Sequence, residues 1–271
     1  MKKALLFVIF FFVSAQFCFA GILVIGGLSR ENTVNRGEKY EGLIYLKNTE
    51  DRASEVKVYQ TEYLFFDDGK NFYGDPGSNP RSNAQWISLG PKRISIPSGD
   101  TVSVYYTVNV PNDPELKGSY WSMIMVEPIP ETSPESTLEN AKEEKQGIKF
   151  GVQTIIRYGI QIVTEIDGTG TSNIRLLNKK LIGQDGKKIL QFDVENIGER
   201  WLSPFVWAEL YNKKGIYIGR FEGHRLRIYP GCSVRHRIDL TEVPKGAYKA
   251  LVIADNRDEK VFGAQYALEI E

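Results

Sequence analysis

Thiols are scarce in this sequence. The 271 residues include two cysteines, and Cys18 lies in an N-terminal segment that we expect to be removed. The remaining one, Cys232, cannot form an intramolecular disulfide, so we expect hydrophobic cores to hold the chain together. We interpret Cys232 as a partly buried, small apolar residue rather than as a thiol that pairs between molecules.

The residues that enzymes and metal sites need are also sparse. His224 and His236 are the only histidines, and they lack the paired short spacings of a zinc motif. The sequence has no phosphate-binding glycine motif after a strand and no Gly-x-Ser-x-Gly elbow. The Asp-Gly pairs that begin at Asp68 and Asp185 are typical of hairpin turns rather than of calcium loops. We therefore expect no enzymatic activity, no metal and no cofactor.

The sequence also lacks an excess of either positive or negative charge. Lys and Arg together number 34, and so do Asp and Glu. A chain with this balance has no basic stripe for nucleic acid and no acidic block for a cationic ligand. Beyond the first 20 residues, no segment approaches the roughly 18–20 consecutive apolar residues of a membrane span. We predict that the protein neither binds nucleic acid nor spans a membrane.

The first 20 residues have the pattern of a secretory signal peptide. Lys2 and Lys3 precede the apolar run of residues 4–12, and small residues occupy the two positions that a signal peptidase reads. We predict cleavage after Ala20 and export of the mature chain.

The rest of the chain contains an internal repeat. Residues 96–102 align without gaps with residues 228–234. In both halves an alternating apolar strand follows, then a Val-Pro pair and then a Lys-Gly-x-Tyr sequence. Glycine supplies the turn, and proline ends the next strand because it has no N–H to donate to a ladder. This shared order of elements predicts two domains.

Short strands account for most of both halves. Apolar residues alternate with a period of two at residues 41–47, 55–66, 174–182, 188–196, 205–211 and 216–221. About seven such strands within roughly 100 residues are typical of an immunoglobulin-like β-sandwich. We therefore predict an all-β fold of two tandem immunoglobulin-like domains, residues 21–167 and 172–271, after a signal peptide of residues 1–20.

The longest alternating segment comprises residues 148–166, far more than the usual strand of about 5–6 residues. Residues 128–147 before it lack an apolar period and are predicted to form a mobile loop, and residues 168–171 after it a hinge. A strand that emerges from a loop is a natural sheet edge, to which a partner's strand can add. The alternative is that the whole segment completes the core of the first domain, which we favour for residues 156–166. The partner-facing residues are predicted to be Ile148, Phe150, Val152, Thr154 and Ile156.

This arrangement resembles the periplasmic pilus-assembly chaperones, which consist of two immunoglobulin-like domains at an angle. Their last strand of the first domain carries alternating hydrophobic residues behind a flexible loop, and Gln153-Thr154 with the apolar alternation after it is similar to that strand. The Pro-Gly turn, the Val-Pro pair and the Gly-x-Tyr strand also resemble two-domain surface proteins of Gram-positive bacteria. The resemblance implies a periplasmic chaperone that binds pilus or surface-fibre subunits by strand donation.

The same resemblance implies a basic pair that holds the terminal carboxylate of a client. The chaperones use an Arg on the first strand and a Lys on the donated strand. Arg30 fits the first place, whereas Ile155 stands directly after Gln153-Thr154, so that Arg157 is the nearest basic residue. We predict Arg30 and Arg157 as the carboxylate anchor, with an exposed, solubilising Arg157 as the alternative.

A second function is compatible with the same sequence. A structural or adhesive module of the cell envelope, in the periplasm or at the cell surface, would bind polysaccharide, peptidoglycan or surface proteins through its aromatic residues.

Overall fold

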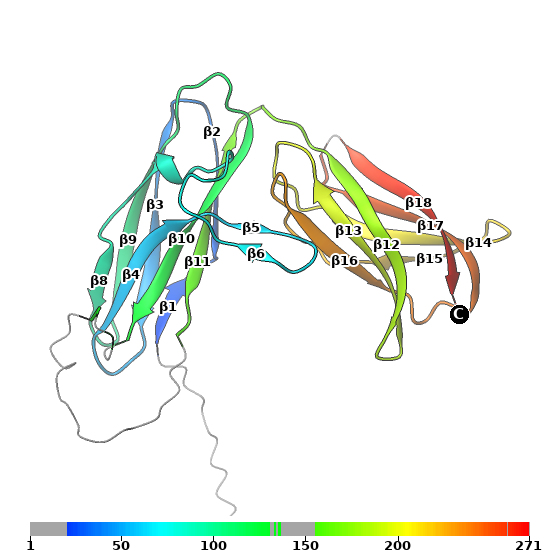
Figure 1. Cartoon of the computed structure of the whole chain (residues 1–271), viewed down its shortest axis with the longest axis horizontal. Coiled ribbons are helices and arrows are strands. Elements are labelled where there is room, and N and C mark those ends of the chain that lie inside the picture. The colour runs from blue at the N-terminus through cyan, green and yellow to red at the C-terminus, as the bar shows by residue number, and fades with distance from the viewer. Residues whose placement is uncertain (1–20, 131–132, 134, 137–154, 259, 271) are drawn as a thin grey trace, which may run out of the picture.

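The described part of the chain consists almost entirely of β-strands. The computed structural model describes residues 21–130, 133, 135–136, 155–258 and 260–270. A short 3₁₀ turn, η1 (Ala84–Trp86), interrupts the strands. The strands form two groups of sheets that lie side by side (Figure 1). The predicted all-β class is confirmed. Among the described residues, no helix has the length and apolar character needed to cross a membrane.

The first group is a sandwich of two sheets. One sheet has the order β1 (Ile22–Ile25), β3 (Lys39–Asn48), β9 (Thr101–Asn109) and β7 (Ile87–Leu89). The other has the order β2 (Ser29–Val34), β11 (Tyr158–Ile166), β10 (Gly118–Ile129), β4 (Ser54–Thr61) and β8 (Arg93–Ile96). Alternate residues of both sheets are buried between them, as the period of two requires. This core includes Ile44, Leu46, Val56, Val104, Ile124, Ile160 and Ile162.

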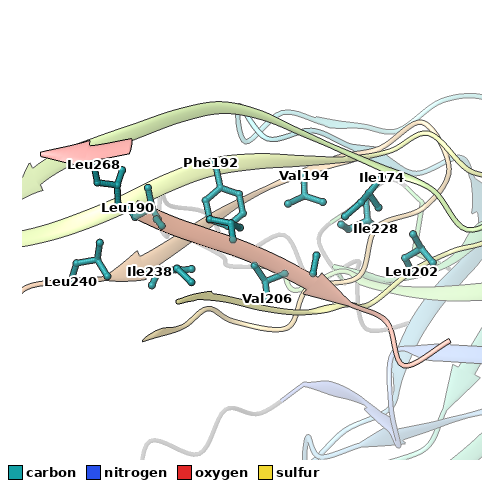
Figure 2. Packing of buried hydrophobic residues seen from close by; sticks show 14 of the residues in the cluster. Ile174, Leu190, Phe192, Val194, Leu202, Val206, Ile228, Ile238, Leu240 and Leu268 are labelled. Atoms are coloured by element: carbon teal, nitrogen blue, oxygen red, sulfur yellow. The ribbon is translucent and has the colours of Figure 1, made fainter. Parts of the chain in front are cut away.

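The second group is a smaller sandwich built in the same way. Its three-stranded sheet has the order β12 (Ile174–Gln184), β13 (Lys187–Asn196) and β16 (Ser233–Asp239). Its four-stranded sheet has the order β15 (Tyr217–Glu222), β14 (Phe205–Asn212), β17 (Gly246–Asp255) and β18 (Val261–Ile270). Leu190, Phe192, Ile238 and Leu268 point into the space between these sheets (Figure 2). Cys232 is fully buried in this core, deeper than the partly buried position predicted.

The repeat in the sequence has a structural counterpart. Gly99 and Gly231, at equivalent positions of the repeat, both have positive φ angles, +71° and +76°. A β-carbon is strained in this backbone conformation, so glycine is the residue that fits the turn. Each turn is followed by a strand of the core, β9 in the first group and β16 in the second.

One predicted strand is interrupted at a position where the apolar alternation continues. Residues 55–66 were expected to form a single strand, but β4 ends at Thr61 and the chain turns into a hairpin of β5 (Leu64–Phe65) and β6 (Asn71–Phe72). Because this hairpin extends from the first group toward the second (Figure 1), Leu64 and Phe65 pack against the second core instead of the first. The apolar residues of β4 thus pack in the first core, whereas those of β5 pack against the second.

The long strand predicted for residues 148–166 is shorter in its described part. Residues 155–157 lie outside any strand, and β11 begins at Tyr158. The register pairs Val126 of β10 with Tyr158, and two residues further Pro128 would face Ile156. Pro128 has no N–H to donate to Ile156, which explains the end of this ladder. The predicted loop of residues 128–147 begins later than expected, because β10 continues to Ile129; most of the loop lies outside the described residues.

Residues between β11 and β12 contact both groups of sheets. The hydroxyl of Thr169 accepts a hydrogen bond from the N–H of Gly118 at 3.0 Å, and the carbonyl of Thr171 accepts one from Glu199 at 2.8 Å. Gly170 has a φ of +80°, and a β-carbon there would lie 2.5 Å from the Cα of Gly118. The predicted hinge of residues 168–171 is therefore packed between the two groups.

Candidate partner-binding site

Strand β11 is paired unequally on its two sides. β10 accompanies it from Tyr158 to Ile166, whereas β2 pairs with it in parallel only from Gln161, opposite Ser29. The N-terminal segment reaches this place by changing sheets, since β1 pairs with β3 and β2 with β11. In the part of the chain that the structure describes, no strand faces β11 before Gln161 on the β2 side. We call this stretch, residues 158–160, the open edge.

The backbone direction at the open edge follows from one hydrogen bond. The N–H of Gln161 donates to the carbonyl of Leu28 at 2.9 Å, on the β2 side. Backbone groups of a strand repeat their direction every second residue, so the N–H and C=O of Gly159 point to the same side. Gly159 therefore presents a donor and an acceptor to any strand that extends the sheet here.

The two faces of β11 have different surroundings. Ile160, Ile162 and Ile166 are buried in the core of the first group. Val163, on the opposite face, belongs to the core of the second group, and the neighbouring Gln161 accepts a hydrogen bond from the hydroxyl of Tyr229. The second half of the predicted long strand thus completes a core, as expected, but it contributes to both cores.

The predicted partner-strand residues are described only in part. Ile148, Phe150, Val152 and Thr154 lie outside the described residues. Ile156 is half exposed, at 50%, and the adjacent Ile155 is 40% exposed. Two large apolar side chains in contact with solvent therefore precede the open edge directly.

Arg30 and Arg157, the predicted anchor, are not brought together. Arg30 pairs with Ile162 in the ladder, five residues from Arg157, or roughly 16 Å along the strand. Its guanidinium donates to the carbonyls of Gly27 at 2.5 Å and Ser29 at 3.0 Å, and so holds the segment where the chain changes sheets. Arg157 instead pairs with Glu127 at 3.1 Å and remains 58% exposed.

The outward face of β4, β10 and β11 carries three rows of side chains that cross the strands. The strand registers and the ion pair of Arg157 define them as Lys57–Glu127–Arg157, Tyr59–Met125–Gly159 and Thr61–Met123–Gln161. Residues in such a row are nearest neighbours across the sheet. The rows therefore order this surface from charged, near the start of β11, to uncharged.

The charges of the first row pair with one another, and Lys57 also pairs with Glu135 at 3.3 Å. Glu127 is 7% exposed and accepts a hydrogen bond from the hydroxyl of Tyr59 at 2.8 Å. It also pairs with Lys57 at 3.4 Å and with Arg157 on its other side. Burial raises the pKa of Tyr59, and the hydrogen bond to Glu127 raises it further, so this phenol stays protonated and donating. We call Lys57, Glu127 and Arg157 the charged row.

The other two rows border a pocket of about 630 Å³. Tyrosines and methionines supply half of the residues that line it, namely Tyr59, Tyr63, Tyr73, Met123 and Met125, and Gly159 lies among them. A β-carbon at Gly159 would lie 2.2 Å from the sulfur of Met123, so the Met123 side chain packs directly over this glycine. Tyr73 is 57% exposed and lies with its ring centroid 5.4 Å from that of Tyr63. We call this the tyrosine–methionine pocket.

The space between the two groups is closed by polar and aromatic contacts. Arg227 donates to the hydroxyl of Ser29 at 2.6 Å, pairs with Glu31 and lies over the ring of Trp201 at 4.6 Å. Trp121 stacks on Tyr229 with a centroid distance of 4.6 Å and an interplanar angle of 9°. Ser29 and Glu31 lie almost 200 positions from Arg227 in the sequence, so sequence reasoning did not reveal these contacts.

The candidate reactive groups are placed where they are inert. Burial raises the pKa of the Cys232 thiol to about 11, so the thiolate is scarce at neutral pH. His236 is 1% exposed and stacks on Phe192, and burial lowers its pKa to about 4. In the described ranges, no three side chains of His, Cys, Asp or Glu come together as a metal site would require.

The chain was compared with known proteins. No family model matches it, and no curated protein matches it. Several solved structures are similar. The class 5 fimbriae chaperone CfaA is 12% identical, with 90% of this chain and 98% of that chain covered and a TM-score of 0.48. The E. coli chaperone DraB is 13% identical over 93% of this chain and 98% of that chain, with a TM-score of 0.42.

A further similar chain comes from work on a chaperone–tip adhesin complex in the biogenesis of CFA/I fimbriae. It is 12% identical, with 92% of this chain and 98% of that chain covered and a TM-score of 0.47. The similar structures thus include chaperones of fimbriae, the class of protein that the sequence resembles. Because identities and scores at this level concern the fold alone, we base the functional proposal on the contacts of this chain.

Proposed function

We propose that this protein is a periplasmic chaperone for the assembly of pili or other surface fibres. A client subunit would pair one of its strands with β11 at the open edge, without nucleotide or metal. The observation that carries this proposal is the late start of the β2–β11 ladder, which leaves the N–H and C=O of Gly159 directed at a side where no strand of the described residues pairs with it.

An unpaired strand of this kind is a template for strand addition. Proteins usually protect exposed edges with charge, proline or bulges, because such edges recruit other chains. Here Ile155 and Ile156 precede the edge and are exposed. Main-chain hydrogen bonds would supply affinity, and alternate side chains would supply selectivity. On this proposal Phe150, Val152 and Ile156 enter the client, with Ile148 and Thr154 in the same alternation.

The proposal does not rest on a joint anchor of Arg30 and Arg157, since the ladder separates them and each has other partners. It does include export by the signal peptide of residues 1–20, and two domains at residues 21–167 and 172–271. The client class, a fibre subunit, is taken from the chaperones that the chain resembles.

Purification of complexes tests the proposal. The full chain, tagged at its C-terminus, would be co-expressed with a fibre subunit encoded beside its gene and isolated from the periplasmic fraction. We expect a one-to-one complex by size-exclusion chromatography. Changing Phe150 and Val152 to Glu, or Ile156→Glu alone, should abolish the complex and leave the thermal unfolding transition nearly unchanged.

Ile216→Glu provides the matched control, since Ile216 is 56% exposed and lies in the second half of the chain. A complex that survives the changes near the open edge, or that is lost equally in the control, would show that strand addition at β11 is wrong. Binding of isolated wall polymer by the mature protein without any protein client would favour the envelope-module alternative.

A further inference from the structure

The tyrosine–methionine pocket lies directly beside the open edge. Its central row runs from Tyr59 through Met125 to Gly159, and Gly159 is the last residue of that row on the β11 side. The next position across the sheet is the one that an added strand would occupy. The pocket and the open edge are therefore parts of one surface.

The register of an added strand determines which side chain reaches the pocket. A residue paired with Gly159 directs its side chain to the same face of the sheet as Gly159. That face carries Met125 and Tyr59, the wall of the pocket. Because Gly159 has no side chain, the sulfur of Met123 packs over its backbone, and an incoming side chain on this face would lie against that methionine.

The charges around the pocket favour an uncharged occupant. Arg157 is the cation of its wall, and it is already paired with the buried Glu127. The remaining polar groups of the pocket wall are phenol, hydroxyl and amide groups. A charged side chain placed here would lose hydration without gaining a free counter-ion.

The shape and chemistry of the pocket favour an aromatic ring. A volume of about 630 Å³ accommodates a large side chain with room to spare. Tyrosine rings pair with aromatic rings in tilted arrangements, and methionine adapts its shape and makes sulfur–aromatic contacts. Two methionines and three tyrosines thus form a wall that suits a ring better than a short aliphatic group.

We propose that the tyrosine–methionine pocket selects clients by receiving one aromatic side chain, carried by the client residue that pairs with Gly159. This inference rests on the proposed strand addition and extends it from the backbone to the side chain that is recognised. The pocket would then determine which strand, and which register of that strand, is accepted.

Methionine methyl groups provide the readout. The chain contains three methionines, of which Met123 and Met125 line the pocket, so two of the methyl signals of the ¹³C-methyl-labelled full chain report on it. A Met125→Leu variant assigns them. The probes are short amidated peptides of alternating Thr and Val with one central guest residue, Phe, Ala, Glu or Lys, and the Phe peptide with a free carboxylate.

We expect the Phe peptide to bind about tenfold more tightly than the Ala peptide, since an aromatic contact in a pocket of this kind contributes on that order. It should also shift the Met123 and Met125 methyl signals by its ring current. Tyr73→Ala, a change at an exposed side chain, should remove the preference and leave the affinity for the Ala peptide within about twofold. Tyr45→Ala, at an exposed tyrosine of β3, should leave the preference intact.

The peptide experiment distinguishes failure of the aromatic pocket from failure of strand addition. Peptides that bind equally well whatever the guest, with unmoved methyl signals, would overturn the aromatic pocket and leave strand addition standing. A preference for Glu, Lys or the free carboxylate would overturn it in favour of a charged occupant at the charged row. Absence of binding by every peptide would overturn both proposals.

Discussion

Asn48 and Asn196 make the same hydrogen bonds in the two halves of the chain. Each side-chain amide donates to the carbonyl four residues later, Arg52 or Arg200, at 2.8 Å. Each also donates at 2.9 Å to the first residue of the internal repeat, Ile96 or Ile228. Each amide oxygen accepts from the N–H two residues later at 2.9 Å. Both side chains are fully buried, so the repeat is held together by an identical polar centre.

Loss of this centre should destabilise the protein strongly. In Asn196→Ala, the carbonyl of Arg200 and the N–H of Gly198 lose the Asn196 side chain as partner, and the carbonyl of Ile228 keeps the N–H of Leu202. Buried polar groups left unsatisfied make the expected loss in the free energy of unfolding about 3 kcal/mol. Urea denaturation measures it, with Asn109→Ala on the exposed face of β9 as a control expected to change by less than about 0.5 kcal/mol. Equal effects of the two changes would contradict the role of Asn196.

The buried His236 should make the protein less stable in acid. Its folded-state pKa is about 4, below the ordinary value of 6.5, so between these values the unfolded chain binds more protons than the folded one. Stability is therefore lost as the pH falls from about 6.5 toward 4, by about 3 kcal/mol in total.

A His236→Leu variant should show a correspondingly smaller decline when unfolding free energies are measured at several pH values. His224→Leu, at the exposed histidine, should leave most of this decline in place, because burial is the larger cause of the lowered pKa of His236 and the nearby His224 the smaller one. If the His236→Leu variant declines as steeply as the parent between pH 6.5 and 4, the buried imidazole is not responsible.

The ion pair of Arg235 with Asp193 should matter more than pairs at the surface. Asp193 is fully buried; burial opposes its charge, but hydrogen bonds from Arg235 and Asn178 prevail and hold its pKa below the ordinary value. Arg235→Leu leaves this carboxylate without its cation, and the expected loss in unfolding free energy at neutral pH is about 3 kcal/mol.

The exposed pair of Arg175 and Glu195 serves as the comparison. Arg175→Leu should change the unfolding free energy by less than about 1 kcal/mol in the same denaturation experiment. Because the pKa of Asp193 is depressed, its contribution should be present above pH 3.8 and disappear as the pH falls below that value. A loss with Arg235→Leu no larger than with Arg175→Leu would refute this ranking.

Gly118 should tolerate no side chain. It has a φ of +71°, and a β-carbon would lie 2.1 Å from the carbonyl oxygen of Glu199, a backbone atom of the other half. Gly118→Ala should therefore lower the unfolding free energy by about 3 kcal/mol through strain and the clash. Gly183→Ala is the control, since nothing lies within 4 Å of the added carbon. Similar denaturation midpoints for both variants would contradict the close approach.

The strands and turns of the internal repeat could be predicted from the sequence. Glycine turns and the ends of strands at proline depend only on residues that are neighbours in the sequence. It did not reveal the β5–β6 hairpin, because Leu64 and Phe65 continue the alternation of β4 while packing on a different core. The start of β11 at Tyr158 could be inferred from Pro128, but only once the register with β10 was known.

The candidate site depended on register throughout. Arg30 and Arg157 seemed suited to act together by residue type, yet the parallel ladder of β2 and β11 sets them five residues apart. Gly159 carried no signal of its own, since its importance comes from its neighbours Met125 and Tyr59 across the sheet. The alternation of apolar residues determines which side chains of a strand face the core. The register between strands that are far apart in the sequence is determined by the whole fold.

Trp121 and Val163 belong to the chain of the first half and to the core of the second. Phe65, which also belongs to the first half, packs its ring against that of Tyr229 in the second half. The hydrophobic core of the second half therefore includes side chains that come from the first half of the sequence. Cutting the chain between β11 and β12 would leave the second half without part of its interior, so we expect the two halves to unfold as one cooperative unit. The shared core then fixes the angle between the two halves. Rotation about the linking residues would require these buried side chains to separate.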